Sequence, residues 1–256
     1  MLRMIRPREA VWLFLIVFCI AVATLVGTLQ SRGQVPHNQA QQANANKEKV
    51  EGYNGPIVDY AQPQVIDPVG LAKRRIRGAK HDKSLWNVDP EDASDRTVLV
   101  DAVDPDLPAL PVTKSTAVIL GDITDARAYL SNDRTGVYTE FAIRIEEILK
   151  DSPRTVLTTD GTLEISRQGG RVRFPSGREH LYKVSEESMP RVGGRYVFFL
   201  TGNQDEGFSI LTAYELQAGK IIPLDNLRQP QAHKNADQTT FLNQLRIKTT
   251  TPGSLQ

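Results

Sequence analysis

Cysteine is almost missing from this chain of 256 residues, because the one cysteine, Cys19, lies inside an apolar run near the N-terminus. The rest of the chain can therefore form neither an intramolecular disulfide nor a cysteine metal site. An excess of one charge is also missing, since 31 basic and 30 acidic residues leave a net charge of +1. A dedicated nucleic-acid binder normally has a basic excess, so we expect no nucleic-acid partner. A folded domain here must be stabilised by its hydrophobic core alone.

Motifs for catalysis and cofactor binding are missing as well. The sequence has no glycine-rich phosphate loop and no G-x-S-x-G elbow. Its four histidines form no metal-ligand pair at helical or strand spacing; they are His37, His81, His180 and His233. We therefore expect no cofactor, no metal ligand and no catalytic residue.

One enzymatic alternative rests on the segment Glu187-Ser188-Met189-Pro190. It resembles the Ser-Met-x-Pro signature of membrane-anchored signal peptidases, which use a serine activated by a neutral lysine in an apolar site. The resemblance implies Ser188 as the nucleophile of a hydrolase and Lys220 as its partner. Proline follows methionine directly here, however, and the lysine box of that family is not recognisable. The other interpretation of the segment is a turn that leads into a strand.

A long apolar run near the N-terminus predicts a membrane segment. The run extends from Ala10 to Leu29 after three arginines, and about 20 residues at a rise of about 1.5 Å span the hydrocarbon core of roughly 30 Å. A cleaved signal peptide is the alternative, because Ala21-Val22-Ala23 fits a small-x-small cleavage site. The apolar run continues beyond that site, which favours an uncleaved signal anchor with the N-terminus inside. We expect a single-pass protein of the cell membrane with an exported C-terminal part, which is secreted if cleavage follows Ala23.

Residues 30–111 have little apolar periodicity and predict a flexible stalk. Within it, a basic cluster faces only one acid, Asp82. The functional interpretation of the cluster is contact with an anionic surface, such as lipid headgroups or cell-wall polymer, and the alternative is a solvated, partly helical linker. The cluster consists of Lys73, Arg74, Arg75, Arg77, Lys80 and Lys83.

From residue 112 the sequence changes to short strands separated by turn residues, which predicts a mainly β fold, a small OB-like barrel or sandwich. The stretch VYTEFAIRIEEILK at residues 137–150 fits both a helical stripe and an alternating strand. Turn residues at 132–136 precede it and favour a hairpin. We predict a strand to about Glu146, then a bulge at Glu147 that directs the next two apolar residues into the core.

Three segments resemble the netrin/tissue-inhibitor type of OB-like barrel over roughly residues 115–225. They are Val118-Ile119-Leu120-Gly121, Ile145-Glu146-Glu147-Ile148-Leu149-Lys150-Asp151 and Gly194-Arg195-Tyr196-Val197-Phe198-Phe199. The resemblance implies a small barrel. The disulfides of that family and the N-terminal cysteine that its inhibitors place on a protease zinc have no counterpart here, so protease inhibition is not implied. The whole chain also resembles bacterial single-pass exported proteins with one anchor and a small β domain.

Polar residues on the predicted strands indicate a ligand face, since OB-like barrels often bind oligomers on such a face. An ordinary solvated face is the alternative. The candidate residues are Tyr138, Arg144, Arg171, Arg173 and Arg195.

The predicted organisation has five parts. They are a cytoplasmic tail (1–9), a transmembrane signal anchor (10–29), the stalk (30–111), an extracytoplasmic β domain (112–228) and a tail (229–256) with a short helix capped by Asp237. The expected function is a membrane-held binding or scaffolding module without catalytic activity, whose partner is a protein or a cell-envelope polymer.

Overall fold

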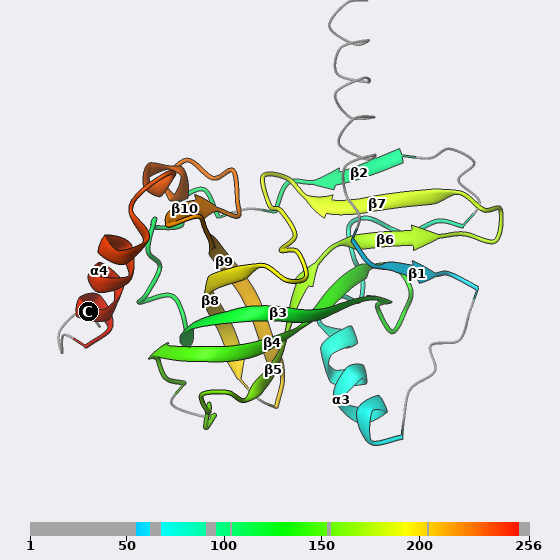
Figure 1. The fold of residues 1–256 in the computed structure, drawn as a ribbon. Coiled ribbons are helices and arrows are strands. Elements are labelled where there is room, and N and C mark those ends of the chain that lie inside the picture. The colour runs from blue at the N-terminus through cyan, green and yellow to red at the C-terminus, as the bar shows by residue number, and fades with distance from the viewer. Residues whose placement is uncertain are drawn as a thin grey trace, which may run out of the picture. The chain divides into compact units, whose positions relative to one another are not determined.

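The fold is mainly β, as the sequence predicts, with one closed barrel and a short C-terminal helix (Figure 1). The structure is a computed structural model that describes residues 55–61, 68–90, 96–102, 104–152, 155–203 and 205–250. The predicted cytoplasmic tail, the membrane segment and the cleavage site after Ala23 lie outside these residues. Within the described ranges, no helix combines the length and the apolar character needed to cross a membrane.

Five strands close the barrel; they are β3 (Ala117–Leu130), β4 (Val137–Lys150), β5 (Thr162–Gln168), β8 (Arg195–Asn203) and β9 (Gly207–Gln217). β4 pairs with β3 and β5, and β8 pairs with β3 and β9, all antiparallel. A parallel pair of β5 and β9 completes the ring. Alternate side chains of the strands point inward and fill the barrel with buried apolar groups, among them Phe141, Ile143, Ile165 and Phe198.

The VYTEFAIRIEEILK stretch forms one continuous strand, β4, that contains bulges. A bulge falls at Glu146, which has no partner on β3 between the pairs formed by Ile145 and Glu147. The prediction of a strand with a bulge is therefore confirmed, but the bulge lies one residue earlier and the strand continues to Lys150. Because a bulge changes the side to which later residues point, Ile145 packs inside the barrel and Leu149 packs in a second apolar cluster outside it.

Helix α4 (Gln238–Thr250) covers this second cluster. The predicted cap is confirmed, because the Asp237 carboxylate accepts a hydrogen bond from the Thr240 amide at 2.9 Å. Three side chains of α4 are buried against the outside of the barrel: Phe241, Leu242 and Leu245. Strand β10 (Lys220–Pro223), which pairs with β9, and the 3-10 helix η1 (Pro230–His233) connect the barrel to α4.

A second sheet of four strands is built partly from the predicted stalk. Its strands, in sheet order, are β1 (Ile57–Asp59), β6 (Gly170–Arg173), β7 (Glu179–Val184) and β2 (Arg96–Val100). β6 and β7 form a hairpin, and β1 and β2 each add to one edge of it in parallel. Trp86 and Val88, which also come from the predicted stalk, are buried in the core of this sheet.

These elements correct the predicted boundary at residue 112. The described residues between 57 and 100 contribute β1, β2 and helix α3 (Pro68–Ala79), and they belong to the same compact unit as the barrel. The sequence did not reveal this because β1 and β2 are short edge strands whose partners lie far along the chain. Such pairing leaves no local period in the sequence.

Candidate functional site

Helix α3 lies against the outside of the barrel, close to strands β3, β4 and β5 (Figure 1). Arg74, Arg77 and Gly78 share one face at helical spacing and point toward the barrel, whereas Ile76 is exposed. A Cβ atom at Gly78 would lie 2.6 Å from the Oδ1 of Asn132 in the β3–β4 turn, so a larger residue there would force the Asn132 side chain to shift. The glycine therefore lets the helix approach the barrel closely.

Arg77 is the centre of this contact. Its Nε donates to Glu140 Oε1 at 2.7 Å and its Nη2 donates to Glu140 Oε2 at 3.1 Å, while its Nη1 lies 3.0 Å from Glu164 Oε2. Arg77 and Glu140 are both buried. Burial acts to lower the pKa of Arg77, but the hydrogen bond and charge of Glu140 outweigh burial and raise that pKa. The guanidinium is therefore a permanently charged anchor between α3 and β4.

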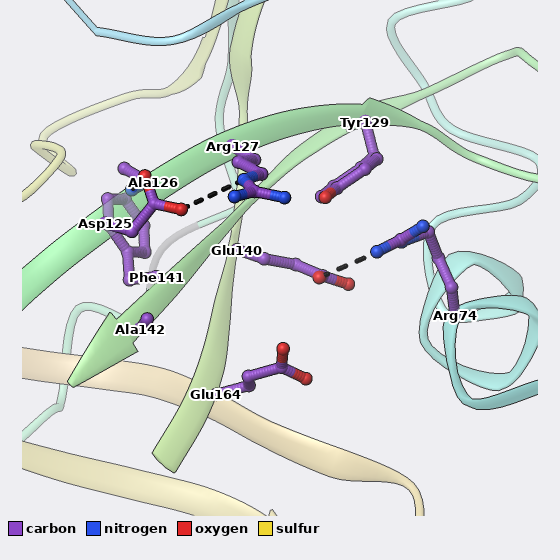
Figure 2. A pocket seen from close by; sticks show the side chains of 9 residues that line it. All are labelled: Arg74, Asp125, Ala126, Arg127, Tyr129, Glu140, Phe141, Ala142 and Glu164. Carbon is purple, nitrogen blue, oxygen red and sulfur yellow. Dashed lines mark hydrogen bonds and ion pairs between the residues drawn. The ribbon is translucent and has the colours of Figure 1, made fainter. Parts of the chain in front are cut away.

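A polar cavity of about 150 Å³ lies beside this ion pair (Figure 2). Its wall presents both signs of charge, because Arg74 and Arg127 line it together with Asp125, Glu140 and Glu164. The Arg127 side chain is 70% exposed and the Glu164 side chain is 56% exposed, so the cavity opens to solvent. The other lining residues are Ala126, Tyr129, Phe141 and Ala142.

Arg74 has unused hydrogen-bonding capacity at the cavity. Its guanidinium carbon lies 4.2 Å from the centroid of the Tyr129 ring. Its Nε lies 4.0 Å from Glu140 Oε2, too far for a hydrogen bond. That Nε is buried and has no hydrogen-bond partner in the described part of the chain. A buried donor without a partner destabilises the protein, so a ligand that accepts a hydrogen bond from Arg74 would be favoured.

Two more buried polar atoms without a hydrogen-bond partner among the described residues are the Tyr138 hydroxyl and His81 Nε2. The two rings stack with their centroids 4.5 Å apart. Burial, assisted by the charge of Lys80, lowers the pKa of His81 to about 4. Burial and the charge of Glu140 raise the pKa of Tyr138. Both side chains are therefore neutral at neutral pH, and they form the uncharged part of the α3 contact.

The end of α3 is held between two turns of the barrel. In the β3–β4 turn, Asp133 accepts the Lys83 amide at 2.7 Å through Oδ2, and its own amide donates to Asp82 Oδ1 at 3.0 Å. In the β8–β9 turn, the Gly207 carbonyl accepts a hydrogen bond from Lys80 Nζ at 3.0 Å. These hydrogen bonds position the helix in addition to its ion pairs.

The structure divides the predicted basic cluster between two faces. Arg74 and Arg77 point toward the barrel and Glu140. The remaining four members are exposed; they are Lys73, Arg75, Lys80 and Lys83. The sequence-based alternative of a partly helical segment agrees with α3, but the helix is packed on the barrel rather than free in a linker.

The predicted ligand face is not assembled as one surface. Tyr138 is fully buried against His81. The four arginines lie on strands of two different sheets, and each is paired with a carboxylate. Arg144 pairs with Asp122, Arg195 with Glu146, and both Arg171 and Arg173 with Glu179.

Ser188 and Lys220 occupy different surroundings. Ser188 lies in the loop after β7, where its amide donates to Asp225 Oδ1 at 3.1 Å. Lys220 is exposed at the first position of β10. Within the described residues, no hydrogen bond or ion pair joins their side chains. The structure therefore does not bring the two together.

The loop of Ser188 is fixed by a buried charge network. Arg167 Nη2 donates to Asp225 Oδ1 at 2.8 Å, and Arg167 Nε donates to Glu187 Oε2 at 3.0 Å. Thr212 Oγ1 donates to Asp225 Oδ2 at 2.8 Å. Arg167 and Asp225 are almost completely inaccessible to solvent. The network connects β5, β9 and two loops, and so stabilises the barrel at this end.

Sequence reasoning missed the acids that hold α3. Glu140 lies two residues from Tyr138 and two from Ala142, so the strand alternation placed it on a polar face. Nothing in that pattern showed that a helix from the predicted stalk covers the face. Glu164 and Asp125 had no sequence signal that linked them to α3.

The sequence matches no protein-family model and no curated protein. The chemistry of the site is therefore indicated by its geometry. In the ranges that the structure describes, no group of three or more His, Cys, Asp or Glu residues could hold a metal ion. The cavity instead presents fixed hydrogen-bond donors and acceptors, an arrangement that can recognise a polar ligand.

Proposed function

We propose that the chain is a membrane-anchored, extracytoplasmic binding module without catalytic activity. Its proposed ligand is an uncharged oligomer rich in hydroxyl and amide groups, such as a glycan of the cell envelope. Residues 10–29 are the proposed single-pass anchor, with the N-terminus inside the cell. The observation that supports the binding site is the cavity beside Arg77, whose wall presents guanidinium and carboxylate groups together.

The mixed charge of the wall selects against charged ligands. An anion in the cavity would meet Asp125, Glu140 and Glu164, and a cation would meet Arg74 and Arg127. A hydroxyl or amide group can donate to a carboxylate and accept from a guanidinium at the same time. The cavity, at about 150 Å³, is smaller than the roughly 300–1,000 Å³ of drug-sized pockets. It therefore suits one unit of an oligomer whose neighbouring units remain outside.

The barrel supports an OB-like assignment, in agreement with the resemblance to the netrin/tissue-inhibitor type. Five strands form a ring in which the third and fifth, β5 and β9, are parallel. OB-like barrels bind oligonucleotides and oligosaccharides on the face of their second and third strands. The corresponding strands here are β4 and β5, which contribute Glu140 and Glu164 to the site. The net charge of +1 argues against an oligonucleotide as the ligand, because nucleic-acid binding normally needs a basic excess.

The test is equilibrium binding by calorimetry to the full chain in a nonionic detergent. The probes are a soluble oligomer of N-acetylglucosamine, polyphosphate and oligolysine. We expect the neutral oligomer to bind and to remain uncut by mass spectrometry. Glu164→Gln should weaken that binding about tenfold or more, because a hydrogen bond to a charged group contributes about 1.5–3 kcal/mol.

Asp122→Asn is the matched control, since it makes the same change at an acid of β3 that pairs with Arg144 outside the cavity. It should leave the affinity unchanged. Preference for either charged polymer, or equal affinity of the Glu164→Gln variant and the parent, would contradict the proposed site. A C-terminal phosphatase reporter tests export separately, because it should be active only if residue 256 lies outside the cytoplasm.

A further inference from the structure

The outward face of helix α3 and the turn after it combine basic and apolar side chains. Lys73, Arg75 and Lys80 are exposed, and Lys83 is exposed in the turn that follows the helix. Ile76 lies among these cations at helical spacing and is 48% exposed. Ile76 is therefore an apolar side chain exposed between cations, on the face opposite to the one that packs on the barrel.

Described carboxylates do not neutralise Lys73, Arg75 or Lys83. The one acid between residues 68 and 83 is Asp82, and its Oδ1 is engaged by the Asp133 amide. In the described ranges, no ion pair joins an acid to Lys73, Arg75 or Lys83. Several exposed arginines elsewhere do have such partners: Arg144 pairs with Asp122, Arg191 with Glu215, and Arg246 with Glu147.

We propose that the outward face of α3 binds the surface of an anionic phospholipid bilayer. Lys73, Arg75 and Lys83 attract the negative headgroups, and Ile76 enters the boundary between headgroups and acyl chains. Leu85, shortly after the helix and 82% exposed, adds a second apolar contact. The stems of the lysines lie along the same boundary while their ammonium groups remain in water.

The position of α3 in the chain favours this occupant. The inference rests on the proposed anchor for its proximity to a membrane, but it is independent of the ligand cavity. The anchor is proposed to end at Leu29 and α3 begins at Pro68. A chain held by that anchor brings its exported part, α3 included, to a membrane surface, whose anionic headgroups are the proposed occupant.

The test uses the full chain with Cys19→Ala and Ala72→Cys, reconstituted in nanodiscs and labelled at residue 72 with a fluorophore. Ala72 is exposed on the outward face. Lipids with a nitroxide in the headgroup region report contact by quenching. We expect strong quenching in discs that contain phosphatidylglycerol and little in discs of phosphatidylcholine alone. Salt at about 1 M should reduce the quenching, because it shortens the Debye length to about 3 Å.

The α3 variant combines Lys73→Gln, Arg75→Gln and Lys83→Gln. Each lost cation should lower the ratio of membrane-bound to unbound α3 by about fivefold. The matched control is the combination of Arg178→Gln, Arg228→Gln and Lys234→Gln, three exposed cations elsewhere, and it should keep the quenching. Equal quenching in both lipids, or quenching that survives loss of the α3 cations, would overturn the proposal. Quenching that does not depend on lipid composition, together with protection of the fluorophore by soluble polyphosphate, would also overturn the proposal.

Failure of the anchor is a distinguishable result. A chain that does not incorporate into nanodiscs would show that the proposed anchor is wrong. The same chain would then be sedimented with phosphatidylglycerol vesicles. Co-sedimentation that disappears in the α3 variant would support the outward face as a lipid contact, and its absence would overturn that contact.

Discussion

Arg77 on helix α3 donates two hydrogen bonds to the carboxylate of Glu140 on strand β4, although the two residues are 63 positions apart in the chain. This buried pair joins a segment that resembles a linker in sequence to the wall of the barrel. Glu140, the acid of this pair, also lines the cavity proposed to bind the ligand. Glu140 therefore contributes both to the α3 contact and to the wall of the binding site.

Replacing Glu140 by Gln should destabilise the protein by about 3–5 kcal/mol, because it leaves the buried charge of Arg77 without its main partner. Denaturant unfolding of the full chain measures the loss. Asp125→Asn is the control on the neighbouring strand. Its pair with Arg127 is exposed, so the cost should stay within about 1 kcal/mol. Equal effects of the two changes would show that the Arg77 pair is not a buried anchor.

His81 should make stability fall as pH falls. Its pKa is about 4 in the folded protein against an ordinary value of 6.5, so the unfolded chain takes up the proton first. Stability is fully present above about pH 6.5 and is lost as pH falls toward 4, by up to about 3 kcal/mol. His81→Phe keeps a ring against Tyr138 without titrating. The difference between parent and variant should grow across this range, and a constant difference would contradict the prediction.

Asp225→Asn should cost about 3–5 kcal/mol, since it leaves the charge of Arg167 buried beside one remaining acid, Glu187. Thermal or denaturant unfolding measures this change. Glu215→Gln breaks the pair with Arg191, whose side chain is largely exposed, and should change stability by about 1 kcal/mol or less. A neutral Asp225→Asn variant would show that the network is not needed for the barrel.

Leu245→Ala should lower the free energy of unfolding by about 2–5 kcal/mol, because Leu245 is completely buried between α4 and the barrel. Ile247→Ala is the control in the same helix, two residues later and 66% exposed. It should cost about 0.5 kcal/mol or less. If both variants were equally stable, α4 would not be docked on the barrel in solution.

Much of the barrel could be predicted from the sequence because its strands alternate and their turns are local. The strand at residues 137–150 and the helix capped by Asp237 both follow from neighbours within a few residues. The second sheet could not be predicted in the same way. Its edge strands β1 and β2 are short. β1 runs parallel to β6 and β2 runs parallel to β7, and these partners are set by tertiary pairing alone.

Only part of the candidate site could be predicted from the sequence. The basic cluster could be recognised, but not that Arg74 and Arg77 point inward while Lys73 and Arg75 point outward. That division depends on where Glu140 and Glu164 come together on the barrel. The residues of the predicted ligand face do not form one surface for a related reason, because strand alternation shows which residues share a face and not what covers it.

The most direct test of the proposed ligand site is amide hydrogen exchange on the full chain with and without a soluble N-acetylglucosamine oligomer. We predict slower exchange at residues 74–79 of α3 and at 140–142 of β4, which flank the cavity. This protection should disappear in the Arg74→Gln variant, because the variant lacks the guanidinium Nε that is the unpartnered donor in the parent. Binding that protects another surface, or protection that persists in Arg74→Gln, would contradict the proposed site.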